Sequence, residues 1–360
     1  MPADYLKYAL MNKEKLKHPA YLIFFLTNRC NLKCGHCFYW ESLNTAGTNQ
    51  ELTIQELENF AKQLDHLEWL ALSGGEPFLR KDIDEVVRVF REINGVKQVT
   101  IPTNGMLPKI VYDKTEAILN ISKNMELSLN LSIDGLEETH DYIRGVKGSF
   151  KKQLETYYLV KELKKKYPNF YLRVNTAICN KNFKELNEFD NLLKKEMPIL
   201  DSHNFEFMRG TAKDPNLSGL SYEDMQETIK LLHDLMCNYK FFTEKNNFKS
   251  KMVRATKMYL YKLYAEQLKN NRRDIKCYAG TTHMVLDPLG DVYVCETLPN
   301  CIGNIRKNTF DEIWNGEKAK EVRDLIEAKK CWCNHSCFMN SNVVFNPVHY
   351  AGIFKEALSV

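Results

Sequence analysis

The sequence predicts an α/β fold: a partial (β/α)6 TIM-like barrel, then a helical linker and a small cysteine-rich module. Short apolar runs alternate with amphipathic segments of helical period over residues 20–210. They make six β/α units, two fewer than the eight that close such a barrel. Of the 11 cysteines, six lie in the last quarter of the chain, which indicates a metal-binding module there.

The barrel elements follow in order along the chain. The run 21–27 is apolar as far as Leu26 and rich in aromatic and branched residues, as in a strand that is covered on both faces. Thr53 is a candidate N-cap of the next helix, and Gly74-Gly75 ends the second strand. We expect strands at 21–27, 68–73, 98–102, 125–133, 171–179 and 204–208, and helices at 53–67, 82–93, 149–166 and 182–196. Right-handed crossovers between such units predict a parallel sheet.

The remaining chain is divided by composition. We expect an N-terminal helix at 1–19, the barrel at 20–213, a helical linker at 214–272, the cysteine-rich module at 273–345 and a C-terminal tail at 346–360. The linker has helical periods at 221–240 and 251–270, the first of which would bury Cys237. The module has a hairpin turn at 287–290 and a helix at 309–328.

Composition and the lengths of the apolar runs limit the classes of protein that the sequence supports. The 50 basic and 46 acidic residues leave a net charge of +4, so neither a nucleic-acid partner nor a membrane surface is indicated. The longest apolar run, 20–26, is far shorter than the roughly 20 residues that span a bilayer. The N-terminus lacks a secretory signal, so we expect a cytoplasmic protein. Thiols stay reduced there, and the cysteines therefore indicate metal chemistry.

One strand has a polar face. Side chains alternate along a strand, so Ser128, Asn130, Ser132 and Asp134 share one face and the intervening leucines the other. In a dry barrel each unpartnered polar group would cost about 1–3 kcal/mol. The polar face therefore predicts a wet interior that holds a ligand. By the same alternation, Asn175 and Cys179 share a face of the fifth strand.

Three cysteines follow the first strand in the run Cys30-Asn-Leu-Lys-Cys34-Gly-His-Cys37. Catalytic sites of parallel sheets lie at this end of the strands. Three cysteines are one too few for a structural zinc ion or a fully ligated [4Fe–4S] cluster, and around a cubane they leave one iron open. His36 is an alternative fourth ligand for zinc, but its position between Gly35 and Cys37 makes that geometry awkward.

This Cys-x3-Cys-x2-Cys pattern, with an aromatic residue before its last cysteine, resembles the radical S-adenosylmethionine (SAM) enzymes. The resemblance extends over residues 21–210. It implies a [4Fe–4S] cluster on Cys30, Cys34 and Cys37 whose open iron chelates SAM. His36 takes the aromatic position, which in the family lies against the adenine.

Further segments match the family in the same order. Ser73-Gly-Gly-Glu-Pro77 is similar to the segment whose backbone meets the methionyl amino group, and glycines permit that approach. Thr103-Asn-Gly105 is similar to another recurrent turn, and the family places a serine and an arginine like Ser132 and Arg144 on the SAM ribose and carboxylate. The candidate cofactor-binding residues are His36, Gly74, Gly75, Glu76, Asn104, Ser132, Arg144 and the inward-facing Asn175.

The second cysteine group resembles the auxiliary-cluster module of these enzymes, called SPASM or, when shortened, twitch. It comprises Cys277, Cys295 and the run Cys331-Trp-Cys333-Asn-His-Ser-Cys337. The full pattern contains Cys-x2-Cys-x5-Cys-x3-Cys. This chain matches only its last part, with Cys333 and Cys337 as the Cys-x3-Cys pair. The resemblance thus implies one auxiliary [4Fe–4S] cluster, on Cys277, Cys295, Cys333 and Cys337, with Cys331 and Cys301 as alternatives. A zinc knuckle is the other interpretation.

The resemblance implies that a reductant such as flavodoxin or ferredoxin reduces the cluster, which cleaves SAM to a 5′-deoxyadenosyl radical. This radical abstracts hydrogen from an unactivated carbon, leading to oxidation, bond formation or epimerisation. Cys179 is a candidate hydrogen donor, and Glu206 and Arg209 are candidate substrate-facing groups.

A small-molecule substrate is the primary hypothesis. The first cysteine comes at position 30, which leaves no room for the N-terminal recognition domain of most peptide-modifying (RiPP-type) maturases, the second hypothesis. A third is a non-catalytic iron–sulfur or zinc protein.

Overall fold

The computed structural model describes residues 17–45, 47, 50–237 and 248–359. The helix expected at 1–19 therefore falls almost entirely outside the described residues. Within the described part, no helix is long and apolar enough to cross a membrane.

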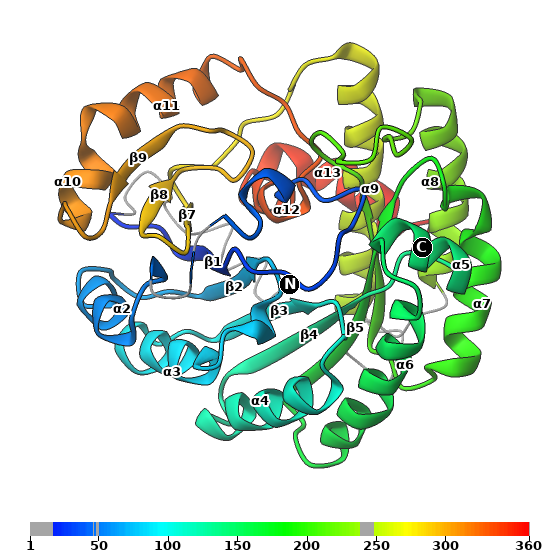
Figure 1. The fold of residues 1–360 in the computed structure, drawn as a ribbon. Coiled ribbons are helices and arrows are strands. Elements are labelled where there is room, and N and C mark those ends of the chain that lie inside the picture. Colours follow the sequence, from blue (N-terminus) through cyan, green and yellow to red (C-terminus); the bar gives the residue numbers. More distant parts are fainter. Residues whose placement is uncertain (1–16, 46, 48–49, 238–247, 360) are drawn as a thin grey trace.

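Six parallel strands form the barrel, as predicted (Figure 1). They are β1 (Tyr21–Thr27), β2 (Trp69–Gly74), β3 (Gln98–Thr103), β4 (Glu126–Ser132), β5 (Phe170–Ile178) and β6 (Ser202–Phe207). Each pairs in parallel with the next along the chain. The sheet curves into an open barrel and brings the loops that follow the strands to one end.

The C-terminal module continues this sheet instead of forming a separate unit. Strand β7 (His283–Leu286) pairs in parallel with β1, and β8 (Asp291–Tyr293) and β9 (Cys301–Asn304) add antiparallel, giving the order β6-β5-β4-β3-β2-β1-β7-β8-β9. The expected hairpin turn at 287–290 lies between β7 and β8. A free β1 edge would leave a row of backbone groups unpaired, and β7 pairs them.

Helices cover the outer face of the sheet. They are α2 (Ile54–Ala61), α3 (Ile83–Asn94), α4 (Pro108–Ile121), α5 (Glu137–Arg144), α6 (Ser149–Val160) and α7 (Leu186–Glu196), with short 3₁₀ helices at 40–42, 77–79, 161–165 and 183–185. Thr53 caps α2 in a capping box with Glu56. The 14-residue α4 was not predicted, although Pro108 opens it and Val111, Thr115, Ile118 and Leu119 are buried at helical spacing.

The remaining helices depart from expectation in three places. They are α8 (Tyr222–Cys237), α9 (Phe248–Asn270), α10 (Phe310–Asn315), α11 (Glu317–Glu327), α12 (Ser336–Val344), the 3₁₀ helix 347–349 and α13 (Tyr350–Ala357). The single helix expected at 309–328 is wrong, because the extended backbone of Gly316 separates α10 from α11. The tail at 346–360 is largely helical, since α13 packs on α9. Cys237 is exposed, not buried.

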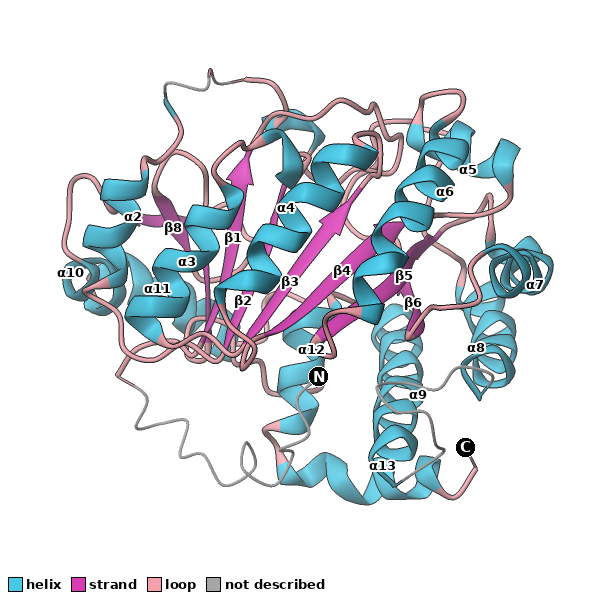
Figure 2. Cartoon of the chain, turned by 90° about the horizontal axis from the view of Figure 1, so that it is seen from below, coloured by secondary structure: helices cyan, strands magenta, loops and turns pink. Residues whose placement is uncertain are grey.

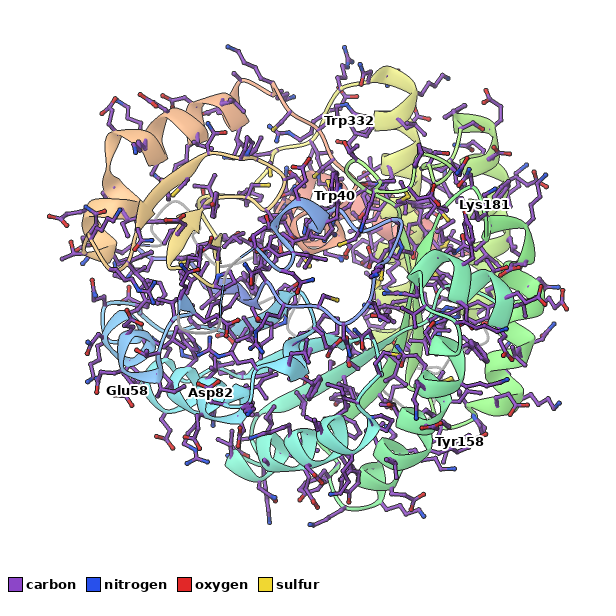
Figure 3. The ribbon with its side chains drawn as sticks, in the orientation of Figure 1. Trp40, Glu58, Asp82, Tyr158, Lys181 and Trp332 are labelled. Atoms are coloured by element: carbon purple, nitrogen blue, oxygen red, sulfur yellow. The ribbon has the colours of Figure 1, made fainter. Side chains whose placement is uncertain are left out.

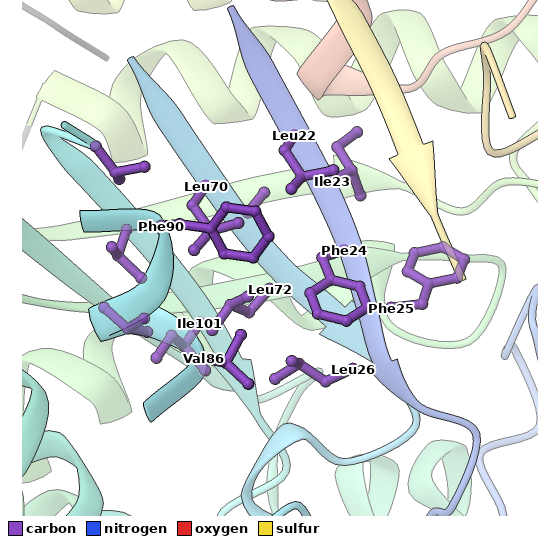
Figure 4. Packing of buried hydrophobic residues seen from close by; sticks show 14 of the residues in the cluster. Leu22, Ile23, Phe24, Phe25, Leu26, Leu70, Leu72, Val86, Phe90 and Ile101 are labelled. Atoms are coloured by element: carbon purple, nitrogen blue, oxygen red, sulfur yellow. The ribbon is translucent and has the colours of Figure 1, made fainter. Parts of the chain in front are cut away.

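The main core lies between the sheet and the outer helices. All seven residues of β1 are buried, and Figure 4 shows its Leu22 and Phe24 beside Leu70 and Leu72 of β2 and Phe90 of α3. This confirms a strand that is covered on both faces. In Figure 2, α9, α12 and α13 lie at the end where the strands begin, opposite the loops that carry the first cysteines.

Candidate active site

The first cysteine loop leaves the carboxyl end of β1 and is held by neighbouring loops. Cys30, Cys34 and Cys37 are all half-buried. The Gly35 N–H donates to the Ile143 carbonyl at 2.8 Å, and the Gly35 carbonyl accepts from the Asp214 N–H at 2.9 Å. Burial raises the pKa of Cys30 to about 11, so the free thiol is protonated at neutral pH.

The glycine pair after β2 packs directly against this loop. Gly74 has φ +111°, and a Cβ on Gly75 would lie 2.0 Å from the Arg29 carbonyl oxygen. The Gly75 and Glu76 N–H groups donate to the carbonyls of Thr27 and Arg29 at 2.8 and 2.9 Å. The resemblance places the backbone of this segment on the methionyl amino group of SAM, which stays a prediction; the structure shows that the glycines also allow the backbone leading to Cys30 to approach closely.

Glu76 and Asn104 tie together the loops after β1, β2 and β3. Glu76 is 2% exposed, and its carboxylate accepts from the Asn104 N–H at 2.7 Å and the Thr103 hydroxyl at 2.9 Å. Burial raises its pKa to about 7. The Asn104 side-chain amide donates to Asn31 of the cysteine loop at 2.7 Å. The cofactor-binding roles of both residues stay predictions; the structure shows that they join these loops through contacts that the sequence did not reveal.

Arg144 reaches the cysteine loop from the end of α5. Its Nε lies 2.6 Å from Asp134 Oδ2, and its Nη1 lies 3.9 Å from Cys34 Sγ. His36 Nε2 is 3.8 Å from the same Asp134 oxygen. Burial lowers the pKa of His36 to about 4, so its imidazole is neutral at pH 7. The placement of Arg144 on the SAM carboxylate stays a prediction; its Nε pairs with a buried carboxylate of the protein.

A cavity of about 190 Å³ lies inside the barrel. Ser128 and Asn130 line it, which confirms that the polar face of β4 faces a hollow interior. Ser132, two residues further along β4, is not among the lining residues. The cavity therefore lies below the layer of Ser132, towards the beginnings of the strands.

The far wall of this cavity is formed by β5, β6, α9 and α12. Asn175 lines it and accepts from the Asn204 amide at 2.9 Å, while Lys257 of α9 donates to Asn204. Glu206 lines it as expected. Burial raises the pKa of Glu206 and lowers that of Lys257 to about 8. Sequence reasoning missed Lys257, because it comes from the helical linker.

Cys179 lies apart from the cavity. Strand β5 ends at Ile178, so the face expected to be shared with Asn175 does not continue to Cys179. Its side chain is fully buried and packs with Ile143 and Leu217. Its role as a hydrogen donor stays a prediction that this packing does not support.

Four cysteines of the C-terminal module line one small cavity. They are Cys277, Cys295, Cys331 and Cys333. Cys337 instead lines the barrel interior, and Cys301 lies on β9 with its thiol 3.4 Å from the Gly303 carbonyl. The set expected from the sequence contained Cys337 in place of Cys331. Trp332, which lies between Cys331 and Cys333 in the sequence, is beside the end of α9 (Figure 3), and its indole N–H donates to Asn271 at 2.8 Å.

A buried polar group joins the two cysteine regions. Arg209, just after β6, lies 3.0 Å from His335 Nδ1 and 3.5 Å from Glu296, and His335 contacts Glu296 as well. The Arg209 guanidinium also lies 4.3 Å from the ring centre of Phe38, the residue after Cys37. Arg209 was expected to face substrate, which stays a prediction; it does not line the barrel cavity but lines a different one, together with Trp332 and Cys333.

The donor sets suit iron–sulfur clusters. Within the described residues, no three His, Cys, Asp or Glu side chains are grouped closely enough to hold a single metal ion. Thiolates are the usual ligands of such clusters, and each cysteine that binds a cubane ligates a different iron, so the cysteines need not converge on one ion. Three cysteines spread along one loop and four around one cavity supply that type of donor.

Comparisons with known proteins agree with this chemistry. The sequence model of the Radical SAM superfamily matches residues 24–193, and that of the SPASM iron–sulfur cluster-binding domain matches residues 277–338. The AdoMet-dependent heme synthase of Methanosarcina barkeri (strain Fusaro) is 29% identical over 334 residues, 87% of either chain. The subtilosin biosynthesis protein AlbA of Bacillus subtilis (strain 168) is 25% identical over 309 residues, 82% of this chain and 60% of AlbA.

Two solved structures share the fold. Streptococcus suis SuiB bound to S-adenosylmethionine superposes with a TM-score of 0.61 at 18% identity, covering 86% of this chain and 68% of SuiB. Native anSMEcpe with bound AdoMet gives 0.61 at 19% identity, covering 95% and 96%. Together with the two domain matches, the barrel and its cysteine loops show that this chain is a radical SAM enzyme with a SPASM-type auxiliary-cluster domain.

Proposed function

We propose that this enzyme transforms a small molecule held in the barrel cavity, beneath the loops that carry Cys30, Cys34 and Cys37. The observation that carries the proposal is a cavity of about 190 Å³ between the strands and α12, to which polar side chains of β4, β5 and β6 contribute. It lies next to the Ser132 layer, on which the sequence resemblance places SAM. When bound, the cluster and SAM would supply a radical that abstracts hydrogen from an unactivated carbon.

The chain's own residues have separate tasks in this proposal. Cys30, Cys34 and Cys37 would hold the cluster that binds SAM, and flavodoxin or ferredoxin would be the electron donor. Glu76 and Asn104 fix the loops after β1, β2 and β3 relative to one another through their hydrogen bonds. The cavity walls orient the substrate and exclude water, which protects reactive intermediates.

For the auxiliary cluster, we infer that Cys277, Cys295, Cys331 and Cys333 are the ligands. The support is that these four thiols line one cavity. Arg273 lies 3.5 Å from the Cys331 sulfur, so a cation is placed to stabilise that thiolate.

A peptide substrate is the second candidate, because two of the relatives are linked to peptides. AlbA is named for bacteriocin biosynthesis, and SuiB has been solved bound to its precursor peptide SuiA. A second cavity of about 360 Å³, lined by Met208, Leu220, Tyr264 and Trp332, offers an apolar surface beside the auxiliary cysteines.

The test uses protein reconstituted anaerobically with iron and sulfide. Dithionite and SAM should yield 5′-deoxyadenosine with the wild type and with Cys237→Ala, which removes an exposed thiol, but not with Cys34→Ala. Equal yields from all three proteins would refute the proposal. Deuterium transfer to 5′-deoxyadenosine from labelled extract, divided into small-molecule and peptide fractions, then distinguishes the two substrate classes.

A further inference from the structure

Two asparagine side chains that line the barrel cavity each have a side-chain oxygen without a hydrogen-bond partner among the described residues. Asn130 on β4 is 6% exposed, and its Oδ1 is buried with no hydrogen-bond partner among the described residues. The Oδ1 atom of Asn340 on α12 is likewise buried with no hydrogen-bond partner among the described residues. Both residues line the cavity, and they come from elements more than 200 positions apart in the sequence.

Other polar groups of the same wall are paired within the protein. Asn175 accepts from Asn204 at 2.9 Å, Thr100 accepts from the Trp69 indole N–H at 2.9 Å, and Ser341 lies 3.1 Å from His283 Nε2. A buried polar group without a partner costs about 1–3 kcal/mol. The two unpaired amides therefore mark the places where a ligand is expected to form hydrogen bonds.

The charges of the wall narrow the class of that ligand. Glu126 and Glu206 line the cavity together with Arg173 and Lys257, so acidic and basic groups are balanced. A strongly anionic or cationic ligand would meet a like charge in a region of low dielectric constant. The volume of about 190 Å³ is below the roughly 300–1,000 Å³ of sites for drug-sized ligands.

We propose that the cavity binds a small, uncharged, polyhydroxylated molecule, of the sugar or cyclitol type, through Asn130 and Asn340. Each amide presents an acceptor and a donor side by side, and a hydroxyl group satisfies both. This inference rests on the proposed function, because it takes the cavity as the substrate site of the radical enzyme.

The experiment measures binding without reduction, so that it does not depend on SAM cleavage. The reconstituted enzyme with SAM is dialysed to equilibrium against a defined mixture of hexoses, cyclitols, nucleosides, carboxylic acids, amino acids and acyl chains. Retained compounds are identified by mass spectrometry. We expect a neutral polyhydroxylated compound to be retained.

Three variants test the contact residues. Asn130→Leu on β4 and Asn340→Leu on α12 should each weaken binding about tenfold, which corresponds to about 1.4 kcal/mol. Asn59→Leu, on the exposed surface of α2, should bind as the wild type does. Thermal midpoints show whether each variant is folded, and either cavity variant suffices if the other is not.

Retention of acids or acyl chains alone, retention of nothing, or unchanged binding by a folded cavity variant would overturn the inference. A protein that retains the polyol but forms no 5′-deoxyadenosine would refute the proposed function only.

Discussion

Replacing Arg209 by methionine should destabilise the contact between the barrel and the auxiliary module. Methionine keeps much of the aliphatic volume but removes the guanidinium that faces Glu296 and His335. The Glu296 side chain is 3% exposed, so its carboxylate would remain buried without its cation. The stacking on Phe38, which extends to the first cysteine loop, would also be lost.

The magnitude follows from the geometry. At 3.5 Å, with an effective dielectric constant near 20, the Coulomb attraction is roughly 5 kcal/mol. Removing one partner of a buried pair typically costs about 3–5 kcal/mol. Because the Arg209 side chain is 23% exposed, water partly screens the pair, and we expect a loss of about 3 kcal/mol. Adding Glu296→Gln to the Arg209→Met variant should recover about 1–2 kcal/mol, since it removes the orphaned charge.

The assay is anaerobic urea unfolding of reconstituted protein, for the wild type, both single variants and the double variant. A double-mutant cycle isolates the coupling between the two residues. Arg209→Lys is the matched control: it keeps the charge but loses the planar fork and the stacking, and its stability should fall between those of the wild type and Arg209→Met. A loss below about 1 kcal/mol for Arg209→Met, or a coupling energy near zero, would refute this reasoning.

The same structure supports three further predictions. Gly75→Ala should lower both the unfolding midpoint and the iron content, because its Cβ would lie 2.0 Å from a backbone oxygen of the cysteine loop; Gly219→Ala, whose nearest contact is 3.8 Å away, should change neither. In reconstituted protein, Cys331→Ser should lower the iron content by about one cluster, whereas Cys337→Ser should leave the iron content unchanged. The reverse result would favour the ligand set expected from the sequence, which contains Cys337 in place of Cys331. His283 is fully buried, and burial lowers its pKa from 6.5 to about 3, so below pH 6.5 the unfolded chain binds a proton that the folded chain does not. Its contribution to stability is complete above pH 6.5 and is lost at about 1.4 kcal/mol per pH unit as the pH falls towards 3; His283→Gln should therefore show a shallower acid dependence of unfolding, and an equal slope would contradict this assignment.

Local patterns predicted the barrel well. The apolar run of β1, the N-cap at Thr53 and the alternation in β4 each reflect interactions between residues near in sequence. The cysteine loop was found for the same reason, since its spacing lies within eight residues. The missed α4 carries an ordinary helical signal, so that omission was an error of interpretation.

Contacts between distant segments could not be predicted from one sequence. The pairing of β7 with β1 and the contact of Arg209 with His335 join residues more than 120 positions apart, and even Lys257 and Asn204 are 53 positions apart. Nothing in the local pattern of either partner indicates the other. Side-chain burial, and with it each altered pKa, depends on these contacts.

The sequence by itself determined the chemistry of this protein, because ligand type and spacing belong to short segments that need only a strand to present them. Cys30, Cys34 and Cys37 are such a segment. Only the tertiary structure decided which cysteines of the C-terminal group share a cavity, where Arg209 and Cys179 lie, and which side chains enclose the barrel interior. Those features arise when elements far apart in the chain pack together, and packing is set by the complementarity of whole surfaces.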